Sequence, residues 1–141
     1  MQICKEILDD ILSNMPMTPP EAGGIIGGKG RKICIWEFDT GYEERGCVYR
    51  PNVDYLNKII AMWLDEGYDF MGILHVHFGE AECLSEGDKR YIEKIVKSMP
   101  NSVRQLYFPI VVQPERKFVS YMATRNESGE VKIVSDEVKV I

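Results

Sequence analysis

The sequence predicts a mixed α/β domain in which helices flank a central, largely antiparallel sheet. Three observations support this fold class. Apolar residues recur at helical spacing in three segments. Short runs rich in β-branched and aromatic residues stand between and after these segments. Turn-forming residues, rather than long linkers, separate the runs, and such alternation is typical of a domain whose helices cover a sheet.

The bulk properties indicate a single globular domain over residues 1–141. The chain has 141 residues, of which 45% are apolar and 28% charged, so it is long enough for one core. A net charge of −5 without a cluster of Lys and Arg argues against a nucleic-acid surface. No apolar run reaches the roughly 18 residues of a membrane span, and the N-terminus lacks the apolar core of a signal peptide. We therefore expect a complete cytoplasmic protein that binds neither nucleic acid nor membrane, and we leave its oligomeric state open.

The four cysteines do not indicate a zinc ribbon or a disulfide framework. Cys4, Cys34, Cys47 and Cys83 form no C-x-x-C pair. Without a secretion signal they are expected to be free thiols. Cys34 lies in the apolar run ICIWEF and is expected in the core.

The first half of the chain predicts one helix, three strands and a second helix. Apolar residues at helical spacing predict the first helix over residues 2–14, which the prolines of MPMTPP end. EAGGIIGGKG predicts a strand with a glycine turn, RKICIWEFD a second strand and RGCVYRP a third. In NVDYLNKIIAMWLDEGY, Asn52 is the candidate N-cap and Gly67 the stop signal of the second helix. Its apolar face comprises Val53, Leu56, Ile60, Trp63 and Leu64.

The second half predicts a buried strand, a third helix and a final set of strands. FMGILHVHF is the buried strand, and SEGDKRYIEKIVKSMP is the helix that follows it. The inward face of this helix comprises Tyr91, Ile92, Ile95, Val96 and Met99. LYFPIVVQ, KFVSYMAT and EVKIVSDEVKVI read as strands joined by the turns QPER and RNESGE.

Both histidines of the chain fall in the predicted buried strand, at positions i and i+2. Such positions share one face of a strand, so His75 and His77 present their imidazoles side by side, with Val76 on the other face. Two neutral imidazoles at this separation suit a zinc ion, and a catalytic zinc takes a third protein ligand and leaves a fourth position for water. Asp88, in the first turn of the next helix, can face back toward the end of the strand and is a plausible third ligand.

Each part of this pattern also has a purely structural interpretation. Ser85-x-x-Asp88 is the pattern of a capping box, in which the serine caps the helix and the acid side chain bonds back to the backbone N–H of the serine. Two histidines on one strand can simply pack, and Glu21 beside a proline turn resembles an ordinary surface acid. The conjunction favours a functional site, because a chain with two histidines rarely meets all these positions by chance.

The spacing H-x-H-x7-S-x2-D resembles the signature of the JAMM zinc metalloprotease family, whose domain is also called JAB/MPN. That family adds a glutamate well upstream, before a strand of small residues, and Glu21 in PPEAGGIIGG matches it. The resemblance covers the order of elements from Glu21 to the helix after Asp88. It implies a JAB/MPN-like architecture, of the cytidine-deaminase-like kind, and a peptidase or isopeptidase activity.

Position by position, the resemblance assigns His75, His77 and Asp88 as the ligands of one Zn²⁺ per chain. Glu21 matches the general acid/base, and Ser85 matches the residue that helps to stabilise the tetrahedral intermediate. The chemistry agrees with these roles, because zinc can bring the pKa of a bound water to about 7 and a nearby carboxylate can carry its proton to the leaving amine.

The resemblance also implies a substrate. Family members cut next to the C-terminal tail of ubiquitin-like proteins, and some small bacterial relatives trim sulfur-carrier proteins. Because the connections in this chain are short, we expect a small ubiquitin-like or sulfur-carrier protein, cleaved after a C-terminal diglycine. The alternative is a non-catalytic scaffold of the same fold. Scaffold members usually lose metal ligands, whereas all three positions are present here.

Some residues depart from the family pattern or invite another interpretation. Many members have proline after the second histidine, and Phe78 in that place puts the shape of the substrate groove in question. Glu80 and Glu82 are expected to be solvated loop acids and Cys83 a bystander, although a thiolate near zinc could act as a redox brake. GGIIGGKG nearly matches a phosphate-binding loop, but Gly30 replaces its Ser or Thr and a strand follows instead of a helix.

Overall fold

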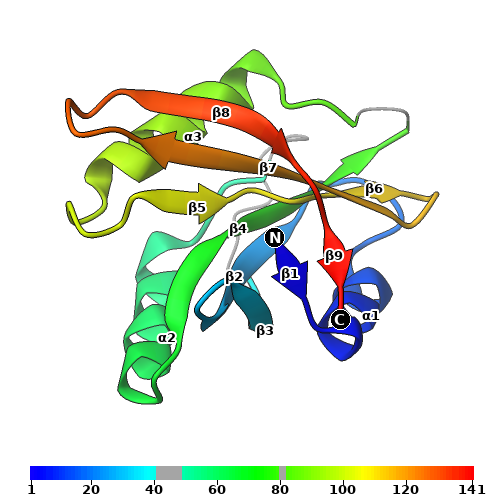
Figure 1. Cartoon of the computed structure of the whole chain (residues 1–141). Coiled ribbons are helices and arrows are strands. Elements are labelled where there is room, and N and C mark those ends of the chain that lie inside the picture. Colours follow the sequence, from blue (N-terminus) through cyan, green and yellow to red (C-terminus); the bar gives the residue numbers. More distant parts are fainter. Residues whose placement is uncertain (41–48, 80–81) are drawn as a thin grey trace.

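The computed structural model describes residues 1–40, 49–79 and 82–141. These residues form three helices and one nine-stranded sheet (Figure 1). The helices are α1 (Lys5–Asn14), α2 (Val53–Asp65) and α3 (Glu86–Ser98). The strands are β1 (Gln2–Ile3), β2 (Gly23–Lys29), β3 (Lys32–Phe38), β4 (Asp69–Phe78), β5 (Gln105–Tyr107), β6 (Ile110–Gln113), β7 (Lys117–Arg125), β8 (Val131–Asp136) and β9 (Lys139–Val140). None of the three helices is long and apolar enough to cross a membrane.

The sheet is mixed, with antiparallel pairs in the majority. Antiparallel pairs join β2 to β3 and β4, and join β7 to β5, β6 and β8. Parallel pairs join β1 to β3 and β9, and join β4 to β5 and β6. The parallel contacts of β4 follow from the crossover through α3, since parallel neighbours need a long connection. The predicted α/β class with a largely antiparallel sheet is confirmed.

Residues 131–141 tie the two margins of the sheet together. β8 pairs with β7 at one margin, and β9 pairs with β1 at the other, after an interval of only residues 137–138. The chain therefore runs from one margin to the other in a single short path (Figure 1). The Met1 amino group lies where the two strands meet and forms an ion pair of 2.9 Å with Asp136.

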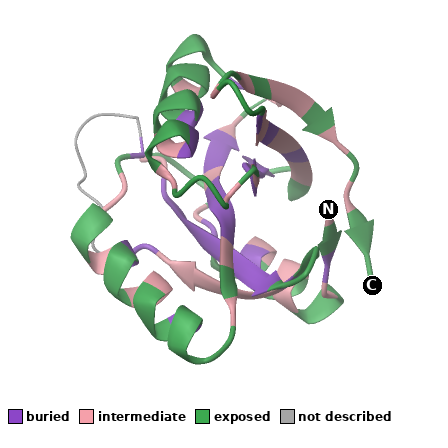
Figure 2. Ribbon diagram, turned by 60° about the vertical axis from the view of Figure 1, so that its left-hand side comes forward, coloured by how far each residue is buried: buried purple, intermediate pink, exposed green. Residues whose placement is uncertain are grey.

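Apolar side chains form a core on each face of the sheet. On one face, Trp63 of α2 and Ile92 of α3 pack with strand residues such as Ile73. On the other face, Ile11 of α1 packs with strand residues such as Val76. The central strands are the most buried part of the molecule, whereas the helices keep an exposed outer side (Figure 2). Alternation along β4 thus directs its odd-numbered side chains, from 73 onward, toward α2 and α3.

The helix caps are those that the sequence predicts. Asn52 accepts a hydrogen bond of 3.1 Å from the Tyr55 N–H at the start of α2. Ser85 caps α3, and its side chain accepts from the Asp88 N–H at 3.0 Å. Gly67 follows the end of α2 with a φ of 86°, a backbone conformation that favours glycine.

The apolar face predicted for α2 is only partly correct. Leu56 and Trp63 are buried, whereas Val53 and Leu64 are 59% and 67% exposed. Val53 is the first residue of the helix, and Leu64 lies about 100° around the helix from Trp63, so neither faces the sheet. On α3, Ile92 and Val96 are buried and Tyr91 is 36% exposed.

Three predicted segments have bounds that differ in the structure. Gln2 and Ile3 do not belong to the first helix, because they pair as β1 between β3 and β9 and α1 begins only at Lys5. LYFPIVVQ is divided at Phe108 and Pro109 into β5 and β6, since proline cannot donate to the ladder. EVKIVSDEVKVI is likewise divided into β8 and β9.

The predicted strand RGCVYRP falls mostly outside the described residues. Its described part, residues 49–51, is not a strand. Tyr49 directs its N–H to the Glu21 side chain rather than to a neighbouring strand.

The described cysteines are free thiols, with Cys4 and Cys34 half-buried and Cys83 exposed, so Cys34 is less buried than expected. Cys47 lies outside the described residues.

Candidate metal centre

β4 presents both histidines on the face that α2 and α3 cover. The Nε2 atoms of His75 and His77 stand 2.7 Å apart, and the two rings meet edge to face at 74°. The His75 side chain is 14% exposed and that of His77 is 9% exposed. Val76 between them is fully buried on the opposite face, as the strand periodicity predicts.

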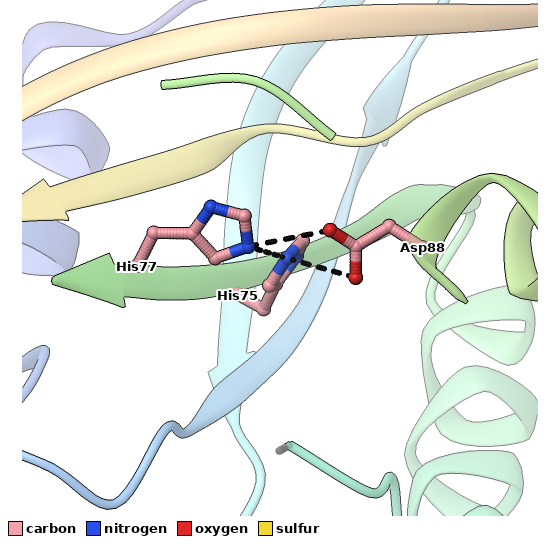
Figure 3. Close-up of side chains that lie close together, drawn as sticks. All are labelled: His75, His77 and Asp88. Carbon is pink, nitrogen blue, oxygen red and sulfur yellow. Dashed lines mark hydrogen bonds and ion pairs between the residues drawn. The ribbon is translucent and has the colours of Figure 1, made fainter. Parts of the chain in front are cut away.

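Asp88 reaches the same point from the first turn of α3. Its Oδ1 lies 3.6 Å from the Nε2 of His75, and its Oδ2 lies 3.3 Å from the Nε2 of His77. Figure 3 shows the carboxylate facing both imidazoles, with the strand on one side and the helix on the other. The candidate ligand atoms of the three residues all lie within 4.8 Å of one another. The structure therefore brings together the three residues predicted as metal ligands.

The donor set fits a divalent zinc ion. Around a tetrahedral zinc with bonds of about 2.0–2.1 Å, neighbouring ligand atoms stand roughly 3.3 Å apart. The Asp88–His77 separation of 3.3 Å matches this value, the Asp88–His75 separation of 3.6 Å is longer, and the 2.7 Å between imidazoles is shorter.

The histidines hold Asp88 in its charged form. Partial burial by itself raises the pKa of the Asp88 carboxyl, because it withdraws the charge from water. Hydrogen bonds from His75 and His77, and that from the Ser85 N–H, act in the opposite sense and hold the pKa well below its usual range. A deprotonated carboxylate is the form that binds a metal.

Ser85 and Asp88 form a complete capping box. The Ser85 N–H donates to Asp88 Oδ2 at 2.9 Å, while the Asp88 N–H donates to the Ser85 Oγ at 3.0 Å. The structural interpretation of this pair is therefore confirmed. It does not compete with a role in the site, because the Asp88 carboxylate also faces the histidines. An accepting hydroxyl also keeps a proton to donate.

Glu21 is placed beside the site by the register of β2 and β4. Gly23 pairs with His75, and the Val76 N–H donates to the Ala22 carbonyl at 2.9 Å. Glu21, one residue further back, is half-buried and lines the same cavity as His75. Its Oε2 accepts a hydrogen bond of 3.3 Å from the Tyr49 N–H.

A cavity of about 380 Å³ adjoins the metal-binding group. Four of the five predicted site residues line it: Glu21, His75, Ser85 and Asp88. The other lining side chains are mostly apolar and include Pro51, Ile73, Tyr91, Ile92 and Phe108. Burial raises the pKa of the Tyr91 phenol, so Tyr91 stays protonated. The cavity can thus take an uncharged segment close to the metal ligands.

A second cavity, of about 480 Å³, continues from the first between α2 and α3. The two cavities share Pro51, Ile73 and Tyr91. Together they form a groove that leads away from the metal-binding group along the helices. Sequence patterns predicted the candidate ligands but not this groove, because its walls come from elements far apart in the chain.

Two further residues that the sequence patterns did not identify support the site. Asp39 follows β3 and is fully buried, and Tyr49 stands just before α2. The Tyr49 phenol donates to Asp39 at 2.8 Å, while the Tyr49 N–H donates to Glu21. Burial, and then the charge of Asp39, raises the pKa of this phenol. A carboxylate directly after a strand is the one local sign that could have drawn attention to Asp39.

The described residues that depart from the family pattern lie around the site rather than in it. Phe78 ends β4 and packs in the core on the α1 side. Glu82 is not merely solvated, because it forms an ion pair with Lys117. Cys83 is exposed and does not line the cavity of Glu21 and Asp88. Glu80 lies outside the described residues.

Comparison with known proteins identifies the fold. The sequence matches no family model and no curated protein. The structure is similar over its whole length to the protein DSY2949 of Desulfitobacterium hafniense, with a TM-score of 0.70, 16% identity and 93% of that chain covered. It is also similar over its whole length to AF2198, a JAB1/MPN domain protein of Archaeoglobus fulgidus, with a TM-score of 0.55, 19% identity and 99% of that chain covered. The chain thus has a fold like that of a JAB1/MPN domain protein, as the sequence motif predicts.

Proposed function

We propose that this protein is a zinc-dependent peptidase or isopeptidase of the JAMM type. It hydrolyses an amide bond next to the C-terminal tail of a ubiquitin-like or sulfur-carrier protein. The observation that carries the proposal is the convergence of His75, His77 and Asp88 beside a cavity that Glu21 and Ser85 also line. A fold like that of a JAB1/MPN domain protein supports it.

Different residues of the chain would bind the metal, transfer the proton and stabilise the oxyanion. His75, His77 and Asp88 would hold one zinc, which supplies a Lewis acid and makes water a nucleophile at neutral pH. The Glu21 carboxylate takes a proton from the attacking water and returns it to the leaving amine. The hydroxyl of Ser85, which lines the same cavity, donates to the oxyanion that develops on the substrate carbonyl.

The dimensions of the site favour a narrow, extended substrate segment. A glycine pair has no side chains to exclude it from a confined space, so its backbone can pass close to the metal ligands. The connections are short at several turns, with only residues 66–68 between α2 and β4 and 114–116 between β6 and β7. Neither of these two turns carries an inserted loop that could grip a second carrier. We therefore propose a single small carrier, cleaved after its diglycine, rather than a linked chain.

The test uses the zinc-loaded protein and a C-terminally extended carrier of the ubiquitin fold. We expect mass spectrometry to show the extension removed after the diglycine. A carrier in which the diglycine is replaced by Ala-Ala is the matched substrate control, and His77→Ala is the matched protein control. Unrelated peptides cut as readily as the carrier would contradict the substrate class. An uncut carrier with zinc bound would contradict the peptidase.

A non-catalytic scaffold is the second candidate function. It is favoured by one observation, the complete capping box, which already gives Ser85 and Asp88 a structural role. A scaffold that has lost its chemistry would bind the carrier without cutting it. Binding without cleavage, with the same affinity in wild type and Glu21→Gln, is therefore the result that would support the scaffold.

A further inference from the structure

Asp39 is a fully buried acid that the proposed chemistry does not use. Its Oδ2 accepts hydrogen bonds from the Tyr49 phenol and from the Asn52 N–H, both at 2.8 Å. Its own N–H donates to the Gly23 carbonyl at 2.9 Å. A buried carboxylate is costly unless several donors satisfy it, and here donors from the segment before α2 do so. Asp39 therefore holds that segment against the end of β3.

Tyr49 connects Asp39 to Glu21. Its ring lies directly against the Gly23 backbone, where an added Cβ would stand 2.4 Å from a ring carbon. Only glycine leaves room for the ring at this distance. The backbone N–H of the same residue donates to the Glu21 Oε2 at 3.3 Å. Tyr49 thus donates to two carboxylates, to that of Asp39 through its phenol and to that of Glu21 through its backbone N–H.

Glu21 depends on such a contact because it precedes β2 and belongs to neither a strand nor a helix. A glutamate side chain in that position has several rotatable bonds, and hydrogen bonding to a fixed N–H restricts them. The N–H is itself fixed only as firmly as Tyr49, which the buried carboxylate anchors through its phenol. The path from Asp39 to Glu21 is therefore two hydrogen bonds and one residue long.

We propose that Asp39 is a positioning residue for Glu21: through the Tyr49 phenol it fixes the Tyr49 N–H, and that N–H aims the Glu21 carboxylate into the cavity beside His75 and Asp88. The proposal rests on the proposed function of Glu21 as the proton carrier. Tyr49 lines the cavity and Asp39 does not, and neither belongs to the candidate metal-binding group. They act through the orientation of one carboxylate.

The first test follows the Tyr49 amide by NMR and needs no activity. In wild type, Glu21→Gln should move the Tyr49 amide proton resonance, because a charged acceptor is replaced by a neutral one. In the Tyr49→Phe and Asp39→Asn backgrounds the same Glu21→Gln change should move that amide much less. Tyr55→Phe is the matched control, since the Tyr55 phenol also bonds a carboxylate, Glu37, at 2.8 Å. If the Tyr49 amide proton resonance does not move when Glu21→Gln is introduced into the wild-type protein, the proposal is wrong.

The second test measures hydrolysis of the extended carrier. Tyr49→Phe and Asp39→Asn should each lower kcat by about tenfold with little change in KM or zinc content, because misplacing a reacting group costs rate rather than binding. Tyr55→Phe should leave kcat unchanged. In the Glu21→Gln background, Tyr49→Phe should cause no further loss. A further tenfold loss in that background would mean that the phenol acts independently of Glu21, and the proposal would be wrong.

The two tests separate this inference from the function on which it rests. If no carrier is cut but the Tyr49 amide responds to Glu21→Gln as expected, the positioning contact stands and the peptidase fails. If the carrier is cut and the amide does not respond, the peptidase stands and the positioning role fails. Tyr49→Phe removes one oxygen and keeps the ring, so it provides the result if Asp39→Asn does not fold.

Discussion

At the scale of single residues, the first prediction concerns His77, the least exposed of the three candidate metal ligands. We expect about one zinc per chain in the wild-type protein and a much lower content in His77→Ala. The reason is that Asp88 and His75 alone would leave two of the four positions around zinc without a protein ligand. Metal analysis of both purified proteins measures this. An unchanged zinc content in His77→Ala would place the metal elsewhere.

Glu21→Gln should separate metal binding from hydrolysis. The amide keeps the shape of the side chain but cannot take up a proton, so zinc content should stay near wild type while kcat falls by at least about 100-fold. Steady-state hydrolysis of the extended carrier, together with metal analysis, gives both quantities. Full activity in this variant would show that another group carries the proton.

Ser85→Ala should have two smaller effects with different causes. Loss of the hydroxyl removes one donor to the developing oxyanion, and we expect a fall in kcat that is smaller than for Glu21→Gln. Loss of the N-cap should also lower the free energy of unfolding by about 1 kcal/mol. Ser85→Thr keeps the hydroxyl and serves as the control. Denaturant unfolding and kinetics of both variants separate the two effects, and unchanged stability in Ser85→Ala would contradict the observed cap.

The site was predictable to the extent that its residues lie close in the sequence. His75, His77, Ser85 and Asp88 fall within one strand and the next helix, so periodicity and cap patterns placed them. Asp39 and Tyr49 were not predicted, because no spacing relates the end of β3 to a tyrosine ten positions later. Only the pairing of β2 with β3 and β4 brings that tyrosine against Glu21.

At the scale of elements, the C-terminal end of α3 depends on a residue from another strand. Arg125, at the end of β7, is 8% exposed. Its guanidinium donates to four backbone carbonyls at and beyond the end of the helix: Val96, Met99, Pro100 and Val103, at 2.7–3.2 Å. The Val96 and Pro100 carbonyls also accept from the Met99 and Val103 N–H groups, at 3.2 and 2.9 Å. A cation at this end of the helix also suits the helix dipole. Arg125 thus fixes α3, which carries Asp88, to the sheet.

Arg125→Met should therefore lower the free energy of unfolding by about 3 kcal/mol, because it removes a largely buried charged donor that bonds four backbone carbonyls. Arg104→Met is the matched control, since the exposed Arg104 side chain donates a single hydrogen bond within the described residues, to the Asn126 carbonyl. We expect that control to change stability by less than about 0.5 kcal/mol. Denaturant unfolding of the two variants measures the difference. Equal stabilities would show that solvent replaces the guanidinium without loss.

The elements that the sequence predicted best are those with strong local signals. α2 and α3 have side-chain caps and apolar stripes, and their bounds agree with the structure to within one or two residues. The error at β1 has a physical cause, because Gln2 and Ile3 gain more from pairing with two strands than from one more helical turn. That pairing involves β9, more than 130 residues away, so no local sequence pattern can predict it.

At the scale of the whole molecule, a metal ion would join the two layers that the fold places side by side. His75 and His77 belong to the sheet, whereas Asp88 belongs to α3, which packs on it. The three ligand atoms meet only when α3 is docked, and the unfolded chain keeps no such arrangement. Binding to the folded chain alone must stabilise it, by about 2.7 kcal/mol when free zinc is at 100 times its dissociation constant.

Zinc should accordingly raise the thermal midpoint of the wild-type protein by roughly 5–10 °C, and a chelator should reverse the rise. His77→Ala is the control, because it removes a ligand without touching the capping box of Asp88, and its midpoint should not respond to zinc. Magnesium should shift neither protein, since it prefers oxygen ligands to imidazole. Differential scanning calorimetry with and without each metal measures these midpoints. A rise of equal size in wild type and His77→Ala would mean that zinc binds the folded chain at another place, and the link between sheet and helix through the metal would be wrong.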